Sequence, residues 1–488
     1  MKIAFVYIDP SYRVMGPFHL GIASLIAYLR RGGHECQFFH FLGDATEGEY
    51  VEFLARSRPD VVAFSVVSNT FPHLAPLAGL AKTHSSALTV CGGIHPTLSP
   101  DETVALADID VVCVGEGEDA LLELCNALDA GKDASDIGNL WVKRDGEVKR
   151  NPVRPAAADL DALPFPDREV FPYEKSFDVG FMKRSVFMAT RGCPYNCNYC
   201  CNHALKRLYG NGYVRRRSVE NLMEEVEKVT RDFPQVEYNV LHDDLLPLDR
   251  EWFEEFTREY SRRVKLPFEM NCQPNIMTRD VARLAREAGC TLMRFGVESG
   301  NEQMRREVLD RHVSTKRILD AFSFCDEVGI ETLSYNMIGL PFEDRSQLLD
   351  TIKLNGKVTP AVTLVSIFYP YRGTKLFDVC EREGLLSDKH TDSYYEDTVL
   401  EQKTISAEEV RAFRRLFERL VRLYSRCYRL PRVAAGVVEK ALDLWVFSLT
   451  NRHVARVWEK TPWLRRKRVD TGPCYTLEHG KVRVWGQE

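Results

Sequence analysis

Short, continuous apolar runs alternate with helical stretches along most of this 488-residue chain. Such runs, without polar alternation, are typical of strands that are covered on both faces of a parallel sheet. The first part of the chain holds five of them, at residues 2–8, 35–40, 61–67, 87–91 and 111–114. Five strands joined by helical crossovers predict a doubly wound, flavodoxin-like (Rossmann-type) α/β domain over residues 1–135.

The same alternation resumes near residue 185. Strands are expected at residues 185–190, 237–241, 267–271, 292–296, 331–337 and 362–368. Six such units predict a partial (β/α)6 TIM-type barrel over residues 181–385, with its site at the carboxyl ends of the strands. Residues 136–180 are expected to form a linker with a hairpin around Asp145-Gly146. Residues 386–488 depart from the pattern and predict a helical C-terminal domain.

Three cysteines, Cys193, Cys197 and Cys200, follow the strand expected at residues 185–190 with C-x-x-x-C-x-x-C spacing. A loop this tight brings three thiolates to one soft metal centre, one fewer than the usual set around a four-iron cluster. An iron without a protein ligand stays open to substrate, as in other catalytic metal sites. A zinc site would normally bring a second Cys or His pair at short spacing, and none follows. A disulfide is unlikely in a chain with no secretory signal. We expect Cys201 to pack rather than to bind metal.

The loop RGCPYNCNYCCN, with Tyr199 before the last cysteine of the motif, resembles the signature of radical S-adenosylmethionine (SAM) enzymes. The resemblance implies a [4Fe-4S] cluster held by the three cysteines. Its open iron would bind the amino and carboxylate groups of SAM, and its reduction would give a 5′-deoxyadenosyl radical. The later strings RFGVESGNEQMRREVLDR, YNMIGLPFED and YPYRGTKLF resemble further motifs of the same family.

Several polar residues and glycines stand after the predicted barrel strands. A carboxylate there can accept charge-assisted hydrogen bonds from the ammonium group of SAM, and Glu298 has only Arg294 as a nearby partner in its own segment. Taken singly, each carboxylate is more often a helix N-cap or a solvated loop residue. Taken together with the resemblance, the expected SAM-binding residues are Tyr199, Asp243, Asp244, Glu298, Ser299, Gly339, Tyr369 and Gly373.

The strings GGIHPT at residues 92–97 and GEGE at residues 115–118 resemble the cobalamin-binding domain that precedes many radical SAM domains. The contacts that this implies are Ser65, Ser68, Asn69, Gly92, Gly93, His95, Gly115 and Glu116. The loop after the first strand reads DPSYRVMG and lacks the D-x-H-x-x-G motif, so we expect cobalt without that histidine ligand. Glycines that only form tight turns, and a degenerate domain that binds nothing, are the alternatives.

The resemblance implies a cobalamin-dependent radical SAM enzyme. Methylation of an unactivated carbon in a small-molecule, natural-product or lipid precursor is the favoured reaction, with one SAM methylating Co(I) and a second SAM supplying the radical. A radical cyclase or a ring-rearranging enzyme with the same cofactors is the alternative. A radical SAM enzyme that has lost cobalamin and an iron–sulfur redox sensor are further alternatives.

Charge and composition limit the partners. The net charge of −5 argues against a nucleic-acid binder, and we find no apolar stretch of about 18 residues that would span a membrane. The 14 cysteines are scattered apart from the one cluster, which favours a reducing, cytoplasmic location. A small-molecule substrate and an electron donor such as flavodoxin or ferredoxin are expected. Basic helices over residues 401–428 and 433–451 predict a solvated cap, a lid, or a peripheral membrane contact.

Overall fold

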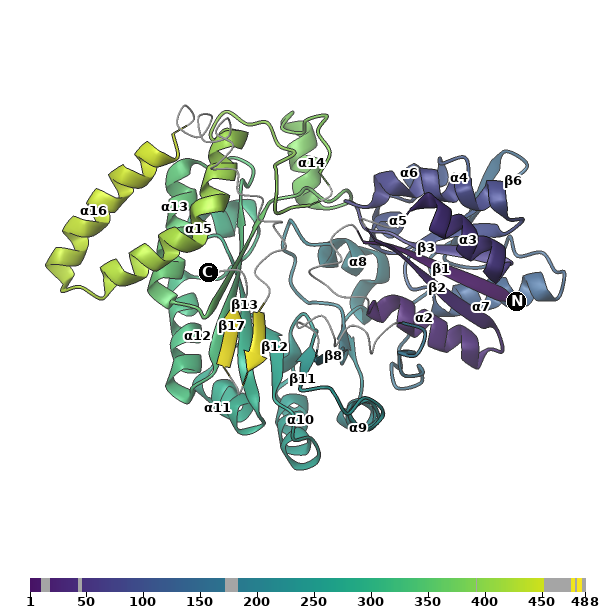
Figure 1. Ribbon diagram of the computed structural model, residues 1–488, viewed down its shortest axis with the longest axis horizontal. Helices are drawn as coiled ribbons and strands as arrows, with labels where there is room; N and C mark the ends of the chain where they lie inside the picture. Colours follow the sequence, from purple (N-terminus) through teal and green to yellow (C-terminus); the bar gives the residue numbers. More distant parts are fainter. Residues whose placement is uncertain are drawn as a thin grey trace.

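The computed structural model describes residues 1–9, 18–42, 46–171, 183–391, 393–451, 475–478 and 481–484. An N-terminal α/β domain lies at the right of Figure 1, and a half-barrel lies at its centre. Two long helices near the C-terminus lie on the far side of the half-barrel (Figure 1). The loop predicted at residues 9–16 lies almost wholly outside the described residues, as does the end of the predicted linker.

The N-terminal sheet is parallel over five strands in the order β2-β1-β3-β4-β5, which is the flavodoxin-like order. The strands are β1 Lys2–Asp9, β2 Glu35–Leu42, β3 Val61–Ser65, β4 Leu88–Gly92 and β5 Val111–Cys113. Alternate residues of β1 point into two different cores. Ile3 and Phe5 pack with α2 (Leu20–Arg31) and α7 (Glu118–Asp129), whereas Val6 packs with the helices of the other face. Both faces are buried, which explains the continuous apolar runs.

The other face is covered by α3 Glu47–Ser57, α4 Leu74–His84 and α6 Pro100–Val104. Two features differ from the sequence prediction. The hairpin at Asp145-Gly146 forms, as β6 Leu140–Arg144 and β7 Glu147–Arg150, but it pairs antiparallel with β5 and extends the sheet rather than standing in a linker. A short helix, α5 Ile94–Leu98, occupies the predicted GGIHPT loop.

The second sheet is the predicted half-barrel, with six parallel strands in the order β15-β14-β13-β12-β11-β8. They are β8 Arg184–Phe187, β11 Tyr238–Leu241, β12 Phe268–Cys272, β13 Cys290–Glu298, β14 Glu331–Ile338 and β15 Val362–Ile367. The helices of the outer layer are α9 Val219–Asp232, α10 Arg250–Arg263, α11 Arg279–Glu287, α12 Thr315–Val328 and α13 Arg345–Val358. Each begins after a Ser, Thr or Asp whose side chain accepts a backbone N–H bond in the first turn.

The half-barrel is closed at its β15 edge by α15 Ala407–Tyr428, whose apolar residues Phe413 and Phe417 pack with α13 and β15. Helix α16 Arg432–Leu449 follows and lies outside α15 (Figure 1). The C-terminal part is not purely helical, because β16 Tyr475–Glu478 and β17 Lys481–Val484 pair antiparallel. Within the described chain, no helix combines the length and apolarity that a membrane crossing requires.

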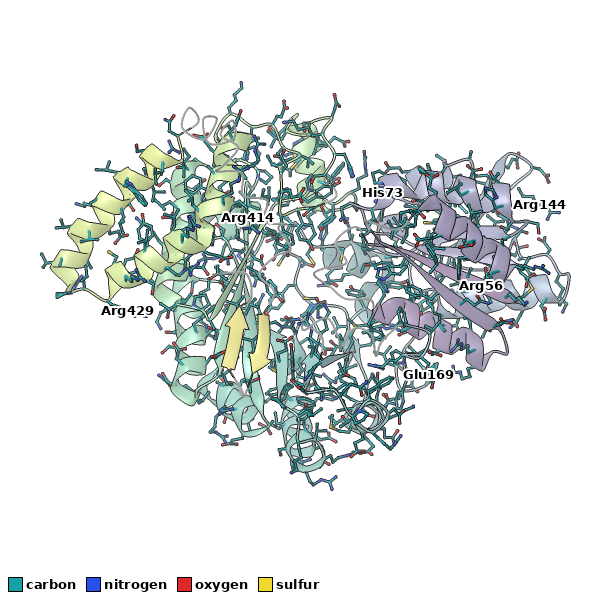
Figure 2. The ribbon with its side chains drawn as sticks, viewed as in Figure 1. Arg56, His73, Arg144, Glu169, Arg414 and Arg429 are labelled. Atoms are coloured by element: carbon teal, nitrogen blue, oxygen red, sulfur yellow. The ribbon has the colours of Figure 1, made fainter. Side chains whose placement is uncertain are left out.

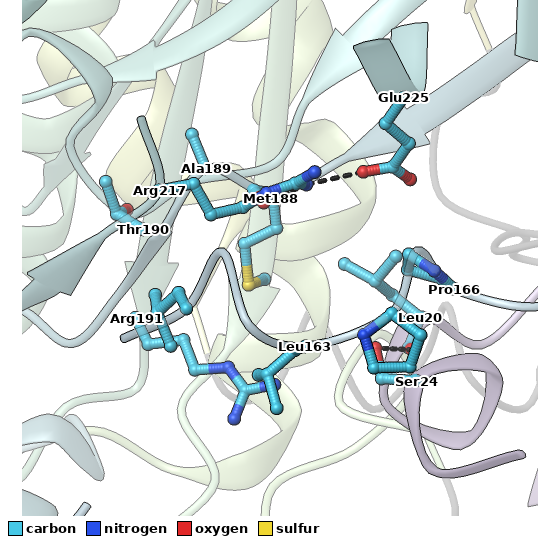
Figure 3. Close-up of a pocket in the computed structure, with 12 residues that line it drawn as sticks. Leu20, Ser24, Leu163, Pro166, Met188, Ala189, Thr190, Arg191, Arg217 and Glu225 are labelled. Carbon is cyan, nitrogen blue, oxygen red and sulfur yellow. Dashed lines mark hydrogen bonds and ion pairs between the residues drawn. The ribbon is translucent and has the colours of Figure 1, made fainter. Parts of the chain in front are cut away.

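Arg168 ties the segment between the two domains to both of them. Its guanidinium lies 5.0 Å from the ring centroids of Phe18, in the N-terminal domain, and of Phe187, in β8. It also donates to Glu225 at 2.8 Å. Figure 3 shows Glu225 paired with Arg217 beside a cavity of about 60 Å³, where α2, residues 160–166 and the end of β8 meet. This buried pairing fixes the path of the connecting segment.

A second set of charged contacts joins the loop after β5 to the half-barrel. Glu116 accepts hydrogen bonds from Arg215 at 2.6 and 3.0 Å and lies 3.2 Å from Arg191. Arg191 also donates to Glu118 at 2.6 Å. The backbone N–H of Glu116 donates to the Tyr209 hydroxyl at 2.6 Å. We call these five residues the domain seam. Their charged side chains are 7–25% exposed, so the seam is largely shielded from water.

Glu116→Gln tests the seam. It leaves two poorly solvated guanidinium groups without their shared carboxylate, and we expect it to cost about 2 kcal/mol of domain association. That corresponds to roughly 30-fold more frequent opening, measured as faster proteolysis between residues 151 and 171. The matched control is Glu123→Gln, which breaks a more exposed pair with Arg154 and should change the cleavage rate only about two- to threefold. Equal rates in the two variants would contradict this role of the seam.

Candidate active site between the two domains

The cysteine loop begins after β9 Thr190–Arg191 and ends where α8 Asn202–Tyr209 starts. Gly192 turns the chain into the loop with φ of 96°, and a Cβ there would lie 2.5 Å from the carbonyl oxygen of Tyr213. Asp243 fixes the entry to the loop. One oxygen of its buried carboxylate accepts hydrogen bonds from the backbone N–H groups of Ala189 and Thr190 at 2.9 and 2.5 Å. Burial raises the pKa of Asp243 to about 6.

N–H donors reach the sulfur atoms of two cysteines in the predicted motif. The Arg311 guanidinium lies 3.9 Å from Sγ of Cys197, and the backbone and side-chain nitrogens of Asn202 lie 3.5 and 3.4 Å from Sγ of Cys200. Such donors stabilise thiolates and tune the reduction potential of a bound cluster. The neighbouring Cys201 thiol also lowers the pKa of Cys200.

No three His, Cys, Asp or Glu side chains in the described part of the chain converge as ligands of a single ion. The thiolates of a four-iron cluster bind different irons, so they stand further apart than the ligands of one ion. Cys193 and Cys200 share one short loop, and their sulfurs are close enough to influence each other electrostatically. The donor set and its N–H environment therefore fit an iron–sulfur cluster.

Glu298 lies beside this loop at the end of β13. The strand pairing with β14 is interrupted between Gly296 and Glu298, and Glu298 adopts a φ of 64°. Burial raises its pKa, while the neighbouring Arg311 guanidinium and the Tyr199 hydroxyl favour its charged form. Arg311 therefore connects Glu298 to Cys197. Arg294, the partner suggested by the sequence, instead lies 3.5 Å from Glu269.

The other residues predicted to bind SAM differ in the contacts that they make. Asp244 belongs with the cysteine loop, because it accepts a hydrogen bond from Asn202 at 3.0 Å. Ser299 and Gly339 lie at strand ends with their backbones already bonded: the Ser299 carbonyl accepts from Arg305 and the Gly339 N–H donates to Glu343, each at 2.6 Å.

Tyr369 and Gly373 follow β15. Tyr369 packs against Tyr371, with ring centroids 5.5 Å apart. Gly373 has a φ of 78°, and a Cβ there would lie 2.8 Å from Cβ of Leu98 in α5. Glycine at 373 thus allows contact with the N-terminal domain, whatever its role toward SAM.

Arg311 and Glu343 also belong to this site, and neither was predicted from the sequence. Burial raises the pKa of Glu343 to about 8, and this carboxyl group holds the Gly339 turn. Arg311 is the last residue of the string RFGVESGNEQMRREVLDR, but it lies 114 positions beyond Cys197, and the string alone does not indicate contact with a cysteine. Glu343 lies in the string YNMIGLPFED, and the resemblance of that string to a family motif was the signal for it in the sequence.

The loops predicted to hold cobalamin form one connected edge. The backbone N–H of Val66, just after Ser65, donates to the Gly92 carbonyl at 3.0 Å. A Cβ at Gly93 would lie 2.8 Å from the Val66 carbonyl, so this close approach requires glycine. Thr97 donates to the Gly93 carbonyl and accepts from the Gly115 N–H, at 2.8 and 3.0 Å. The loops after β3, β4 and β5 therefore meet.

His95 lies within this edge rather than on its surface. Its ring is 2% exposed and stacks on Phe71, with centroids 4.0 Å apart. Nδ1 is hydrogen bonded to Ser68 at 3.1 Å, and Nε2 lies 3.5 Å from Glu102. Burial and the nearby Arg372 lower the pKa of His95 to about 4, so the ring is neutral at pH 7. Asn69 is buried in the same loop as Ser68.

Gly115 and Glu116 serve the domain seam. A Cβ at Gly115 would lie 2.2 Å from the Tyr209 hydroxyl, and the Glu116 carboxylate is taken up by Arg191 and Arg215. Through these contacts, the connected edge of the first sheet faces the cysteine loop, since Arg191 lies two residues before Cys193. Ligands of a parallel sheet bind at this carboxyl edge of its strands.

Comparisons with known proteins agree with this arrangement. Residues 188–354 match the family model of the radical SAM superfamily, and residues 17–125 match that of the B12 binding domain. An uncharacterized methyltransferase, PH0819, of Pyrococcus horikoshii is 26% identical over 80% of this chain and 84% of its own length. The anaerobic magnesium-protoporphyrin IX monomethyl ester cyclase of Rubrivivax gelatinosus is 26% identical over 77% of this chain and 69% of its own length.

The fold is also similar to a solved structure. The radical SAM methyltransferase TsrM from Kitasatospora setae, with tryptophan and a SAM analogue bound, superposes with a TM-score of 0.64, at 16% identity, over 83% of this chain and 80% of that one. A radical SAM domain works with a [4Fe-4S] cluster and SAM, and a B12-binding domain works with cobalamin, so these are the cofactors of this chain. The chain belongs to the radical SAM enzymes that carry an N-terminal B12-binding domain.

Proposed function

We propose that the protein transfers a methyl group to an unactivated carbon of a small molecule, such as a natural-product or lipid precursor. The observation that carries the proposal is the domain seam, which holds the loop after β5 against the residue that precedes the cysteine loop. A reaction that uses both cofactors on one substrate requires these two edges to face each other. Methyltransferases among the similar proteins support methyl transfer over other uses of the same pair.

When bound, the cluster with SAM supplies a hydrogen-abstracting radical and cobalamin supplies the methyl group. The chain holds and orients these groups. In the proposal, Cys193, Cys197 and Cys200 bind the cluster, while Arg311 and Asn202 donate to its sulfur ligands. The proposed SAM contacts are Tyr199, Asp243, Asp244, Glu298, Ser299, Gly339, Tyr369 and Gly373. The three connected loops of the first sheet hold cobalamin.

The cysteine assignment has a direct test. Cys197→Ala removes one proposed cluster ligand, so anaerobic reconstitution should yield far less than the roughly four irons per chain of the unchanged protein. Cys201→Ser is the matched control in the same loop and should keep its iron. The measurement is iron and sulfide content with the visible absorption spectrum. Iron loss in the Cys201 variant, with full iron in the Cys197 variant, would refute the assignment.

The reaction is tested by anaerobic turnover with methyl-deuterated SAM and candidate small molecules, using either dithionite or a flavodoxin as the reductant. We expect a product that carries the deuterated methyl group, together with 5′-deoxyadenosine. An unmethylated, cyclised product formed at the same rate as 5′-deoxyadenosine would instead identify a cyclase, the activity of one relative. We propose a flavodoxin or ferredoxin as the natural donor. Turnover with dithionite but none with either reduced protein would contradict that choice.

We propose that the protein works in the cytoplasm, because all described cysteines are free, as in a reducing compartment. A formed disulfide in protein purified without reductant and mapped by mass spectrometry would count against this location.

Helix α16 supports a peripheral membrane contact. Its outer side presents Val433, Val437 and Leu444, which are 84, 67 and 73% exposed, and Trp445. Its two acidic residues, Glu439 and Asp443, turn inward to Lys353 at 3.0 and 2.7 Å. The exposed side therefore combines apolar groups with the cations of Arg432 and Lys440, which suits an anionic lipid surface.

Vesicle flotation tests this surface. We expect the protein to float with vesicles that contain phosphatidylglycerol and to stay below with pure phosphatidylcholine. Leu444→Glu should lower the floated fraction at least about fivefold, because it places a charge in the apolar contact. Leu319→Glu, on the exposed side of α12, is the control and should float like the unchanged protein. Flotation that is insensitive to Leu444→Glu would rule out α16 as the contact.

A further inference from the structure

Arg414 is a buried cation without a counter-ion. It lies in the second turn of α15 and is 7% exposed. Figure 2 labels it on the stretch of α15 that lies beside the barrel strands. Among the described residues, no carboxylate forms an ion pair with Arg414 and its buried Nε has no hydrogen-bond partner. Its neighbour Arg411, by contrast, donates to Asp397 at 2.7 Å.

Nε is also unbonded in Arg168, Arg294 and Arg311, but each of these buried arginines donates at least one hydrogen bond to a carbonyl or carboxylate oxygen through its other nitrogens. Arg305 donates to the carbonyls of Ser299 and Val313 and to the Thr315 hydroxyl, at 2.6–2.9 Å. Arg168 pairs with Glu225. The fold therefore supplies acceptors where a guanidinium has a structural role, and Arg414 departs from that pattern.

The surroundings of Arg414 are aromatic. Its guanidinium lies over the Tyr395 ring, 5.5 Å from the centroid, and Tyr395 packs against Tyr394 with ring centroids 4.7 Å apart. The backbone N–H of Ile367, the last residue of β15, donates to the Tyr394 carbonyl at 2.7 Å. The tyrosine pair is thus anchored at the carboxyl end of the half-barrel, the end on which barrel enzymes bind their substrates.

These tyrosines continue toward the cysteine loop. Tyr335, on β14, is close enough to influence Tyr395 electrostatically. Tyr371, which packs against Tyr369, is likewise within electrostatic range of both Tyr394 and Cys200. Tyr371 therefore lies near both the tyrosine pair beside Arg414 and the cysteine loop.

Burying a lone guanidinium costs more than one cation–π contact returns, so an unpaired Arg414 is costly in the free protein. A ligand that brings an anion removes this cost, and the planar fork of arginine matches carboxylate and phosphate oxygens. We infer that Arg414 binds an anionic group, a carboxylate or a phosphate, of the substrate, while the tyrosines contact its apolar or planar body. This inference rests on the proposed function, because it places the substrate at the same site.

The test uses the anaerobically reconstituted holoenzyme and three proteins: unchanged, Arg414→Met, and Arg415→Met. Arg415 is the next residue of the helix and is exposed, so it is the matched control. The midpoint of thermal unfolding is measured with inorganic phosphate, with acetate and with chloride at equal ionic strength. Because ligand binding stabilises the folded state, we expect phosphate or acetate to raise the midpoint of the unchanged protein by about 2 °C or more over chloride.

Arg415→Met should show the same shift, and Arg414→Met should show none. Arg414→Met should also unfold no earlier than the unchanged protein in chloride, because it no longer buries an unpaired charge. A shift with phosphate only would identify a phosphate-bearing substrate, and a shift with acetate only a carboxylate. No shift with either anion, a shift that persists in Arg414→Met, or earlier unfolding of that variant in chloride would overturn the inference. SAM cleavage by the unchanged protein is measured separately, so failure of the proposed function is distinguishable from failure of anion binding.

Discussion

The ion pairs of Glu116 and Glu118 with Arg191 and Arg215 determine how the two halves of this protein can work together. They join the loop after β5 in one domain to β9, which leads directly into the cysteine loop of the other. Charged groups so poorly exposed tolerate little displacement, because each would lose its partner without regaining full hydration. The relative position of the two sheet edges therefore follows from a few well-directed contacts and from glycines that permit close approach.

Carboxylates at the strand ends have separate tasks. Asp243 and Glu343 are buried and accept backbone N–H bonds, which shapes the cysteine loop and the Gly339 turn. Glu298 and Asp244 lie beside the cysteines, and their recorded partners are side chains: Arg311 and Tyr199 for Glu298, and Asn202 for Asp244. Arg311 joins Glu298 to the cysteine loop, since it lies beside Glu298 and donates to the Gly296 carbonyl while it approaches Cys197. A polar network of this kind holds ligands in fixed orientation before a cofactor arrives.

The two sheets, most strand positions and the cysteine loop could be predicted from the sequence, because each depends on local periodicity or on short spacing. The contacts between the domains that Gly115 and Gly373 permit could not. Both glycines were assigned to cofactors, and in addition Gly115 makes room for Tyr209 and Gly373 for Leu98, each in the other domain. The hairpin at Asp145-Gly146 was predicted, yet its pairing with β5 depends on a free sheet edge that no local pattern reveals. The loop at residues 9–16 lies almost wholly outside the described residues.

The central claim is that the cluster and the corrin meet across the domain seam. The most direct measurement is pulsed electron paramagnetic resonance of the anaerobic holoenzyme with cobalt in its paramagnetic Co(II) state. Spin–spin coupling falls off steeply with distance, so neighbouring centres should relax each other. We predict faster relaxation of the cobalt spin when the cluster is reduced than when it is oxidised. Cobalt relaxation that is identical in both states would show that the two centres lie far apart and would contradict the claim.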